Sequence, residues 1–144
     1  MSASNEQAGS ASGAVSPVSR PMNIAATLAI CTGGLLVPGL AHILIGRWIR
    51  GIIFAVCILA MFALGLAMHG KLYDFQFTEP LQFFAFIANI GAGIPYWIAE
   101  RLGWGIGTMT WPSYDYGTTF LWVCGLLNYL IVLDAFDIAQ GRKP

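Results

Sequence analysis

Charged residues are scarce in this sequence. Only 10% of the 144 residues are Asp, Glu, Lys or Arg, whereas a soluble domain carries about a quarter. The seven basic and seven acidic residues cancel, so the formal net charge is zero. A nucleic-acid partner requires a basic surface that neutralises phosphates. The charge balance therefore argues against such a partner.

Cysteines and catalytic motifs are also few. The three cysteines, Cys31, Cys57 and Cys124, lie within apolar runs, and their odd number excludes a complete internal disulfide framework. Their spacing matches no zinc or redox motif, so we interpret them as packing residues. The sequence contains no G-x-S-x-G, H-E-x-x-H or Walker A motif. We therefore expect no catalytic set, no metal site and no cofactor, and a non-enzymatic protein.

Apolar residues dominate the composition. They make up 57% of the chain, and the mean hydropathy is +0.69. A soluble core of this size does not bury so much apolar surface, so lipid must solvate part of it. Four apolar stretches of about 20 residues each match the length that crosses the hydrocarbon layer as a helix. We predict an all-α integral membrane protein with spans at about residues 22–46, 51–69, 81–99 and 116–138.

Polar segments flank the predicted four-helix domain, residues 22–141. Residues 1–21 are rich in Ser, Ala and Gly and predict a disordered tail, and residues 142–144 form a short basic tail. With four crossings, one side of the membrane carries four cations and the other carries three. This small excess favours cytoplasmic termini. The four are Arg20, Lys71, Arg142 and Lys143, and the three are Arg47, Arg50 and Arg101.

A proline interrupts the first predicted span. Pro38 removes a helical hydrogen bond, and Gly39 follows it directly, so we predict a kinked or broken helix there. A broken helix can line a substrate or ion site, as in transporters, but we favour a kink that lets the end of the helix fold back towards the second helix. His42 lies one turn further along, near Arg47, and is a candidate for proton transfer or for a boundary contact. Arg47 and Arg50 form a tight basic turn between the first two spans.

Two asparagines lie near the middle of predicted spans. Asn89 and Asn128 each accompany small residues at helical spacing, which predicts faces that approach closely. We expect these two faces to contact each other or a second subunit. The residues that form them are Ala85, Asn89 and Gly93 in the third span, and Leu121, Gly125, Asn128 and Val132 in the fourth.

Two carboxylates close the fourth span. Asp134 and Asp137 lie near the negative end of the helix dipole, so they need compensation from water or from cations. We expect Arg142, Lys143 and Lys71 to lie near them. A catalytic pair is a weaker interpretation, because the sequence offers no matching histidine or nucleophile beside them.

The break and the basic turn carry a family resemblance. The run Pro38 to His42, followed by Gly46 and Gly51, resembles the two-transmembrane-helix domain family, in which Pro-Gly-x-Gly-x-x-Tyr-x-Gly joins two close helices. Ala41 takes the place of the second glycine, and Leu44 that of the aromatic residue. Residues 22–142 are similar to an uncharacterised bacterial family, number 6677 among the domains of unknown function. The segments that carry this likeness are residues 38–42, 47–51, 116–118, 125–128 and 133–135. The resemblance implies a multi-pass protein of the bacterial inner membrane and adds no reaction.

These observations leave three functional classes in a definite order. The leading hypothesis is an assembly or accessory subunit that acts through helix–helix contacts, with the bilayer and either a second copy or another membrane protein as partners. A small transporter or channel component that uses the broken first helix is the alternative. A membrane enzyme ranks last, because it rests only on isolated polar residues.

Overall fold

The computed structural model describes residues 22–75 and 79–142. The predicted polar tail, residues 1–21, lies outside the described residues, as do residues 143–144 of the predicted basic tail. The described residues form six helices and no strand, apart from one isolated antiparallel bridge between Lys71 and Ile106. The predicted all-α class is confirmed.

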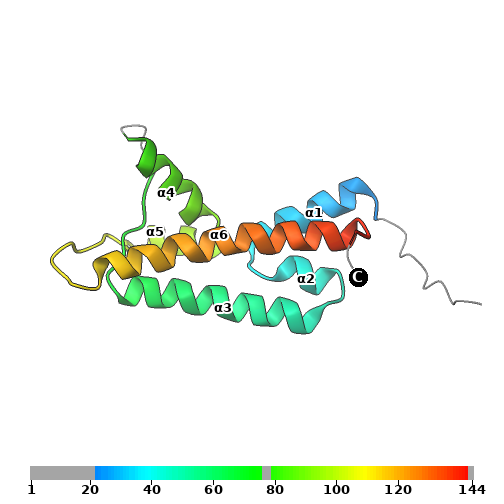
Figure 1. The fold of residues 1–144 in the computed structure, drawn as a ribbon, viewed down its shortest axis with the longest axis horizontal. Helices are drawn as coiled ribbons and strands as arrows, with labels where there is room; N and C mark the ends of the chain where they lie inside the picture. The colour runs from blue at the N-terminus through cyan, green and yellow to red at the C-terminus, as the bar shows by residue number, and fades with distance from the viewer. Residues whose placement is uncertain (1–21, 76–78, 143–144) are drawn as a thin grey trace, which may run out of the picture.

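Two long helices form the centre of the molecule. Helix α3 (Trp48–Ala67) and helix α6 (Tyr114–Ala139) lie side by side and run in opposite directions (Figure 1). Glycine permits their close approach, since a Cβ added to Gly65 would lie 2.9 Å from the carbonyl oxygen of Gly117. Both helices are long and apolar enough to cross a membrane.

The first predicted span is two short helices. Helix α1 (Ile24–Leu36) ends just before Pro38, and helix α2 (Leu40–Leu44) follows, so the predicted break is present. The contacts of this segment along α6 show its direction. Met22 is hydrogen-bonded to Ala139, and Gly34 to Asn128. His42, further along the chain, is hydrogen-bonded to Asp134, which lies between these two positions of α6. The pair α1–α2, called the first hairpin below, therefore enters from one end of α6, reaches its middle and turns back.

The third predicted span is also interrupted. Helix α4 (Pro80–Ile90) and helix α5 (Ile94–Arg101) meet at an angle of 111°. Gly93 has φ +71°, and Pro95 follows within the first turn of α5, so the chain turns sharply where the sequence had predicted one straight helix. By length and composition, two helices of the described residues could cross a membrane, or three if this pair, the second hairpin, is one bent span, against the four predicted. Leu72, before the pair, donates a backbone hydrogen bond to Gly105, after it, at 2.8 Å, so the second hairpin begins and ends at the same end of the molecule, as a re-entrant loop does.

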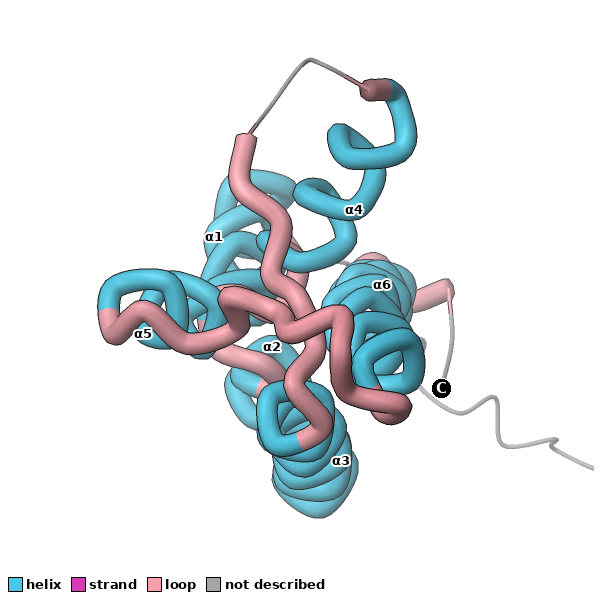
Figure 2. Tube along the Cα trace, turned by 90° about the vertical axis from the view of Figure 1, so that its left-hand side faces the viewer, coloured by secondary structure: helices cyan, strands magenta, loops and turns pink. Residues whose placement is uncertain are grey.

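The two halves of the described chain have the same order of elements. Each has a short helix, a break, a second short helix and then a long helix, as α1–α2–α3 and α4–α5–α6. The first hairpin lies along the C-terminal half of α6 and the second along its N-terminal half (Figure 1). Seen along the long axis, α1 and α4 lie on one side of α6 and α3 lies on another (Figure 2).

The distribution of cations differs from the predicted one. Arg47 follows His42 at the end of the molecule where Met22 and Arg142 lie, whereas Lys71 lies at the opposite end, with its backbone nitrogen bonded to Thr118. The prediction had placed Lys71 with the termini, and Arg47 opposite them. These positions differ from the predicted ones because the first hairpin folds back at Pro38 and does not complete a crossing.

Candidate functional site: the junction of two broken helices

The break after α1 leaves carbonyl groups without backbone donors. Pro38 has no N–H, so the carbonyl of Gly34 loses its usual partner four residues ahead. Asn128 of α6 replaces it, because its side-chain nitrogen donates to the carbonyl oxygens of Gly34 and Leu35, at 3.3 and 3.2 Å. The side chain of Asn128 in α6 thus supplies the hydrogen-bond donor that the carbonyl groups at the end of α1 lack.

The same nitrogen of Asn128 serves the second break. It lies 2.9 Å from the carbonyl oxygen of Gly91, just after the last residue of α4. The hydroxyl of Tyr129 donates to the carbonyl oxygen of Ile87, at 3.0 Å, one turn earlier in α4. Gly125 lies so close to the carbonyl of Ala88 that a Cβ would overlap it. Gly125, Asn128 and Tyr129 share one face of α6, and the end of α4 packs on this face.

The two breaks also touch each other. A Cβ on Gly93 would overlap the carbonyl oxygens of Leu35 and Leu36, which belong to the last turn of α1. Glycine at this position supplies both the positive φ and the space. We call the meeting point of residues 34–39, residues 91–93 and Asn128 the junction.

The predicted contact between the third and fourth spans is present in part. Ala85 and Asn89 of α4 are buried, and Gly125 and Asn128 of α6 pack against the same helix. Gly93, in contrast, lies beyond the bend and packs on α1. The side-chain amide of Asn89 and Oδ1 of Asn128 form no hydrogen bond with any described residue. Of the two predicted asparagines, Asn128 thus makes the polar contacts.

A histidine–carboxylate pair lies one to two turns from the junction. Nε2 of His42 is 3.2 Å from Oδ2 of Asp134. The His42 side chain is fully buried, with the Phe54 ring at its edge (ring centroids 5.1 Å apart), whereas the Asp134 side chain is 34% exposed. The sequence had predicted no histidine beside the carboxylates. This expectation is wrong, because the fold-back at Pro38 brings α2 against α6.

This pair faces an apolar groove between α3 and α6. Asp134 lines a pocket of about 360 Å³ together with the apolar side chains Phe54, Cys57, Ile58, Leu127, Leu130 and Ile131. The imidazole of His42 is thus buried on one side of the hydrogen bond, whereas the carboxylate of Asp134 reaches the groove. No group of three or more His, Cys, Asp or Glu side chains suited to a metal ion occurs among residues 22–75 and 79–142.

Asp137 has a different environment from Asp134. Its Oδ1 lies 3.7 Å from a guanidinium nitrogen of Arg142, whose side chain is 69% exposed, whereas that of Asp137 is 36% exposed. An ion pair of this kind contributes at most about 1 kcal/mol. Compensation by Arg142 is as predicted, whereas Lys71 lies at the other end of the molecule.

A hydrogen bond and a contact between an ammonium group and an aromatic ring stabilise the end of the molecule at Lys71. The backbone nitrogen of Lys71 is bonded to Oγ1 of Thr118, at 3.1 Å, and its ammonium lies 5.0 Å from the centre of the Tyr73 ring. Burial, and next the neighbouring Tyr114, raise the pKa of Tyr73 to about 12. The Tyr73 phenol is therefore neutral at physiological pH.

The structure places the other predicted site residues at the ends of helices. Pro38 and Gly39 form the first break, and Gly39, with φ +81°, packs against Gly51 and Ala55 of α3. Arg47 and Arg50 lie where α3 begins. Sequence reasoning missed the helix break at Gly91 and Gly93, although the run Gly-Ala-Gly-Ile-Pro that contains them is a signal for such a break.

The fold and the junction define an all-α protein with helices suited to a membrane and two broken-helix hairpins that meet on a continuous helix. The model of a family of unknown function (DUF6677) matches residues 29–144, and the chain belongs to this family. No curated protein matches the chain, and no solved structure matches it.

Proposed function

We propose that this protein is a non-enzymatic subunit of a membrane assembly and acts through helix–helix contacts. The observation that carries this proposal is the apolar outer surface of the second hairpin. Helix α4 extends away from the paired α3 and α6 (Figure 1), and its Leu81 and Phe84 are 64% and 66% exposed. Its 11 residues measure about 17 Å along the axis, which is too short to cross the membrane alone.

Helix α5 adds a groove to this surface. Trp97, Ile98, Arg101 and Leu102 line an open pocket of about 410 Å³ on its outer side. Short helices of this kind bury their apolar sides against neighbouring helices, and close packing supplies the main attraction within lipid. A helix of another membrane protein, or of a second copy, is the partner that fits.

Photo-cross-linking in native membranes tests this proposal. A photoreactive residue at Phe84 or Trp97 is expected to give a discrete protein adduct. The same residue at Val56, which is also exposed but lies on α3, is the matched control and is expected to react with lipid. The proposal fails if Phe84 and Trp97 give no more protein adduct than Val56.

A second candidate function is a small transporter or channel component. Two Gly/Pro-interrupted segments, in corresponding positions of the two halves, are typical of transporters whose substrate sites lie near the middle of the membrane. The meeting of both breaks at Asn128 supports this candidate. Purified protein in liposomes would be assayed for ion and solute flux, with Asn128→Ala and His42→Ala as variants. Flux that is absent, or equal in all three proteins, contradicts this candidate.

We further propose that both termini face the cytoplasm of a bacterial cell, with the protein in the inner membrane. Arg47, Arg50 and Arg142 share one end of the described chain, against Lys71 and Arg101 at the other. Lys and Arg are enriched in the short loops of membrane proteins that face the cytoplasm. The excess supports a cytoplasmic position for the end that carries Arg47.

A further inference from the structure

The basic turn, residues 46–50, lies at the start of a membrane-crossing helix. It joins α2 to α3, and two backbone hydrogen bonds shape it, from Gly46 to Ile43 (3.0 Å) and from Arg47 to His42 (2.8 Å). Helix α3, 20 residues long, begins within the turn at Trp48, and after Arg50 it contains no further charged residue up to Ala67. The turn therefore lies at the level where hydrocarbon gives way to headgroups.

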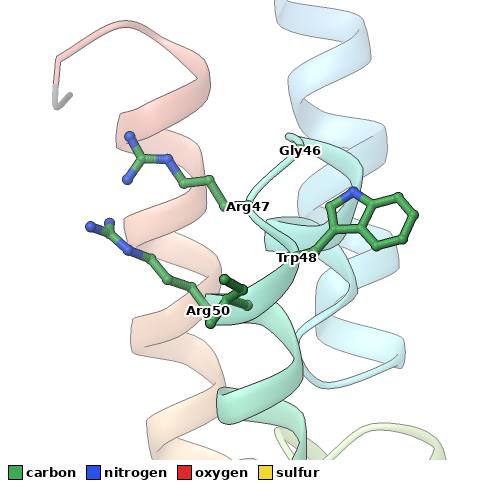
Figure 3. Close-up of a pocket in the computed structure, with 5 residues that line it drawn as sticks. Gly46, Arg47, Trp48 and Arg50 are labelled. Carbon is green, nitrogen blue, oxygen red and sulfur yellow. The ribbon is translucent and has the colours of Figure 1, made fainter.

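The basic turn carries cationic side chains on one side and a large aromatic side chain on the other (Figure 3). Arg47 and Arg50 extend on the same side of the turn, and Trp48 extends on the opposite side (Figure 3). The five residues line an open pocket of about 510 Å³. Trp48 and Ile49 are 66% and 76% exposed. Two guanidinium groups and a large apolar surface thus stand together at the membrane boundary.

Neither guanidinium is neutralised within the described part of the chain. The ion pairs found there join Asp134 to His42 and Asp137 to Arg142, and none includes Arg47 or Arg50. Two neighbouring cations without a carboxylate repel each other, so an anion between them is favoured. Guanidinium binds phosphate through paired N–H donors, which gives both strength and orientation.

We propose that the basic turn binds the phosphate headgroup of an anionic phospholipid, with Arg47 and Arg50 as the phosphate ligands. Trp48 and Ile49 contact the glycerol and upper acyl region of the membrane, where amphipathic and apolar side chains are stable. A zwitterionic lipid carries its own cation beside the phosphate, and it therefore competes less well for two arginines. This site is separate from the junction and does not depend on either proposed function.

Native mass spectrometry of the full-length protein in mild detergent tests the proposal. The probes are phosphatidylglycerol and phosphatidylcholine with identical acyl chains. Wild-type protein is expected to bind phosphatidylglycerol more tightly. The variant Arg47→Gln/Arg50→Gln is expected to bind it roughly 25-fold more weakly, at about fivefold per arginine, with phosphatidylcholine binding unchanged.

Lys71→Gln is the control, because Lys71 is a cation at the other end of the molecule, with its ammonium 5.0 Å from the centre of the Tyr73 ring. The binding of phosphatidylglycerol by Lys71→Gln is expected to equal that of the wild type. The proposal is overturned if the double variant binds phosphatidylglycerol as well as the wild type, or if Lys71→Gln loses as much. An excess of inorganic phosphate is expected to leave the lipid bound. Complete displacement by phosphate would identify free phosphate as the ligand and overturn the lipid assignment.

A single variant keeps the test valid if the double variant does not fold. Arg50 is exposed and lies in the first turn of α3, so Arg50→Gln is expected to fold and to weaken phosphatidylglycerol binding about fivefold. Unchanged binding in a folded Arg50→Gln protein contradicts the proposal.

Discussion

The side-chain nitrogen of Asn128 lies 2.9 Å from the carbonyl oxygen of Gly91, and the same nitrogen reaches the carbonyl oxygen of Gly34 at 3.3 Å. One amide on a continuous helix thereby connects two broken helices that enter from opposite ends of the molecule. Within lipid, every backbone carbonyl needs a donor from the protein itself. Asn128 is consequently the residue on which both hairpins depend.

Replacing Asn128 should destabilise the protein more than replacing Asn89. Asn128→Ala removes the two N–H donors that the carbonyl oxygens of Gly34, Leu35 and Gly91 share, so we expect a loss of about 1–2 kcal/mol in the free energy of unfolding. Asn89 is equally buried, but its amide makes no hydrogen bond to a described residue. Asn89→Ala should therefore change that free energy by less than about 1 kcal/mol. Unfolding by SDS in detergent micelles measures both, and equal losses would contradict the role of Asn128.

Gly93→Ala should disrupt the contact between the two hairpins. Its Cβ would overlap the carbonyl oxygens of Leu35 and Leu36, in addition to the strain of a positive φ. Gly103 is a matched control, since it has φ +68° and nothing within 4 Å of an added Cβ. Gly103→Ala should cost only the strain, about 1–2 kcal/mol, and Gly93→Ala clearly more. Thermal unfolding of the two variants in one detergent compares them, and equal midpoints would show that the junction tolerates a side chain.

His42 and Asp134 should be energetically coupled. In a double-mutant cycle with alanine at both positions, we expect a coupling energy of about 1–3 kcal/mol, because His42 is fully buried. The same cycle on Asp137 and Arg142 should give at most about 1 kcal/mol, since that pair is exposed. A coupling for His42 and Asp134 no larger than that of the exposed pair would mean that α2 does not pack on α6 as described.

Single-cysteine labelling should separate the hairpin arrangement from four complete crossings. After replacement of the three native cysteines, new cysteines at Trp48, Met109 and Arg142 are labelled with a membrane-impermeant maleimide. The structure places Trp48 and Arg142 at one end, and Met109 at the other, beside the end of α3. We expect Trp48→Cys and Arg142→Cys to react from the same side. Four complete crossings would instead pair Trp48 with Met109.

Composition alone was enough to predict the class of the fold. The long apolar runs determine α3 and α6, since lipid permits only helices or closed barrels to span it. Pro38 likewise predicted a break, because a missing N–H is a local property of the chain. Asn128 was singled out as a packing residue for a similar reason, as a polar group deep in an apolar run.

The direction of the chain after each break was not predictable in the same way. A break at Pro38 is compatible with either a kink or a fold-back, and the outcome depends on whether α6 offers a donor at the right depth. His42 and Asp134 are 92 residues apart in sequence, so their contact follows only from the fold-back. The bend at Gly93 had a local signal in its glycines and proline, but the high hydropathy of the segment resembled that of an ordinary span.

The shortness of the first hairpin has a consequence for how the protein is made. Helices α1 and α2 have 13 and 5 residues, so neither is long enough to be integrated as a complete span when it leaves the ribosome. Stable insertion begins with α3. The donor for the carbonyl groups of α1 is Asn128, which is synthesised 94 residues after Gly34. The first hairpin therefore reaches its final position only after this part of α6 has been made, and until then it needs water, lipid headgroups or an insertion factor to solvate its broken backbone.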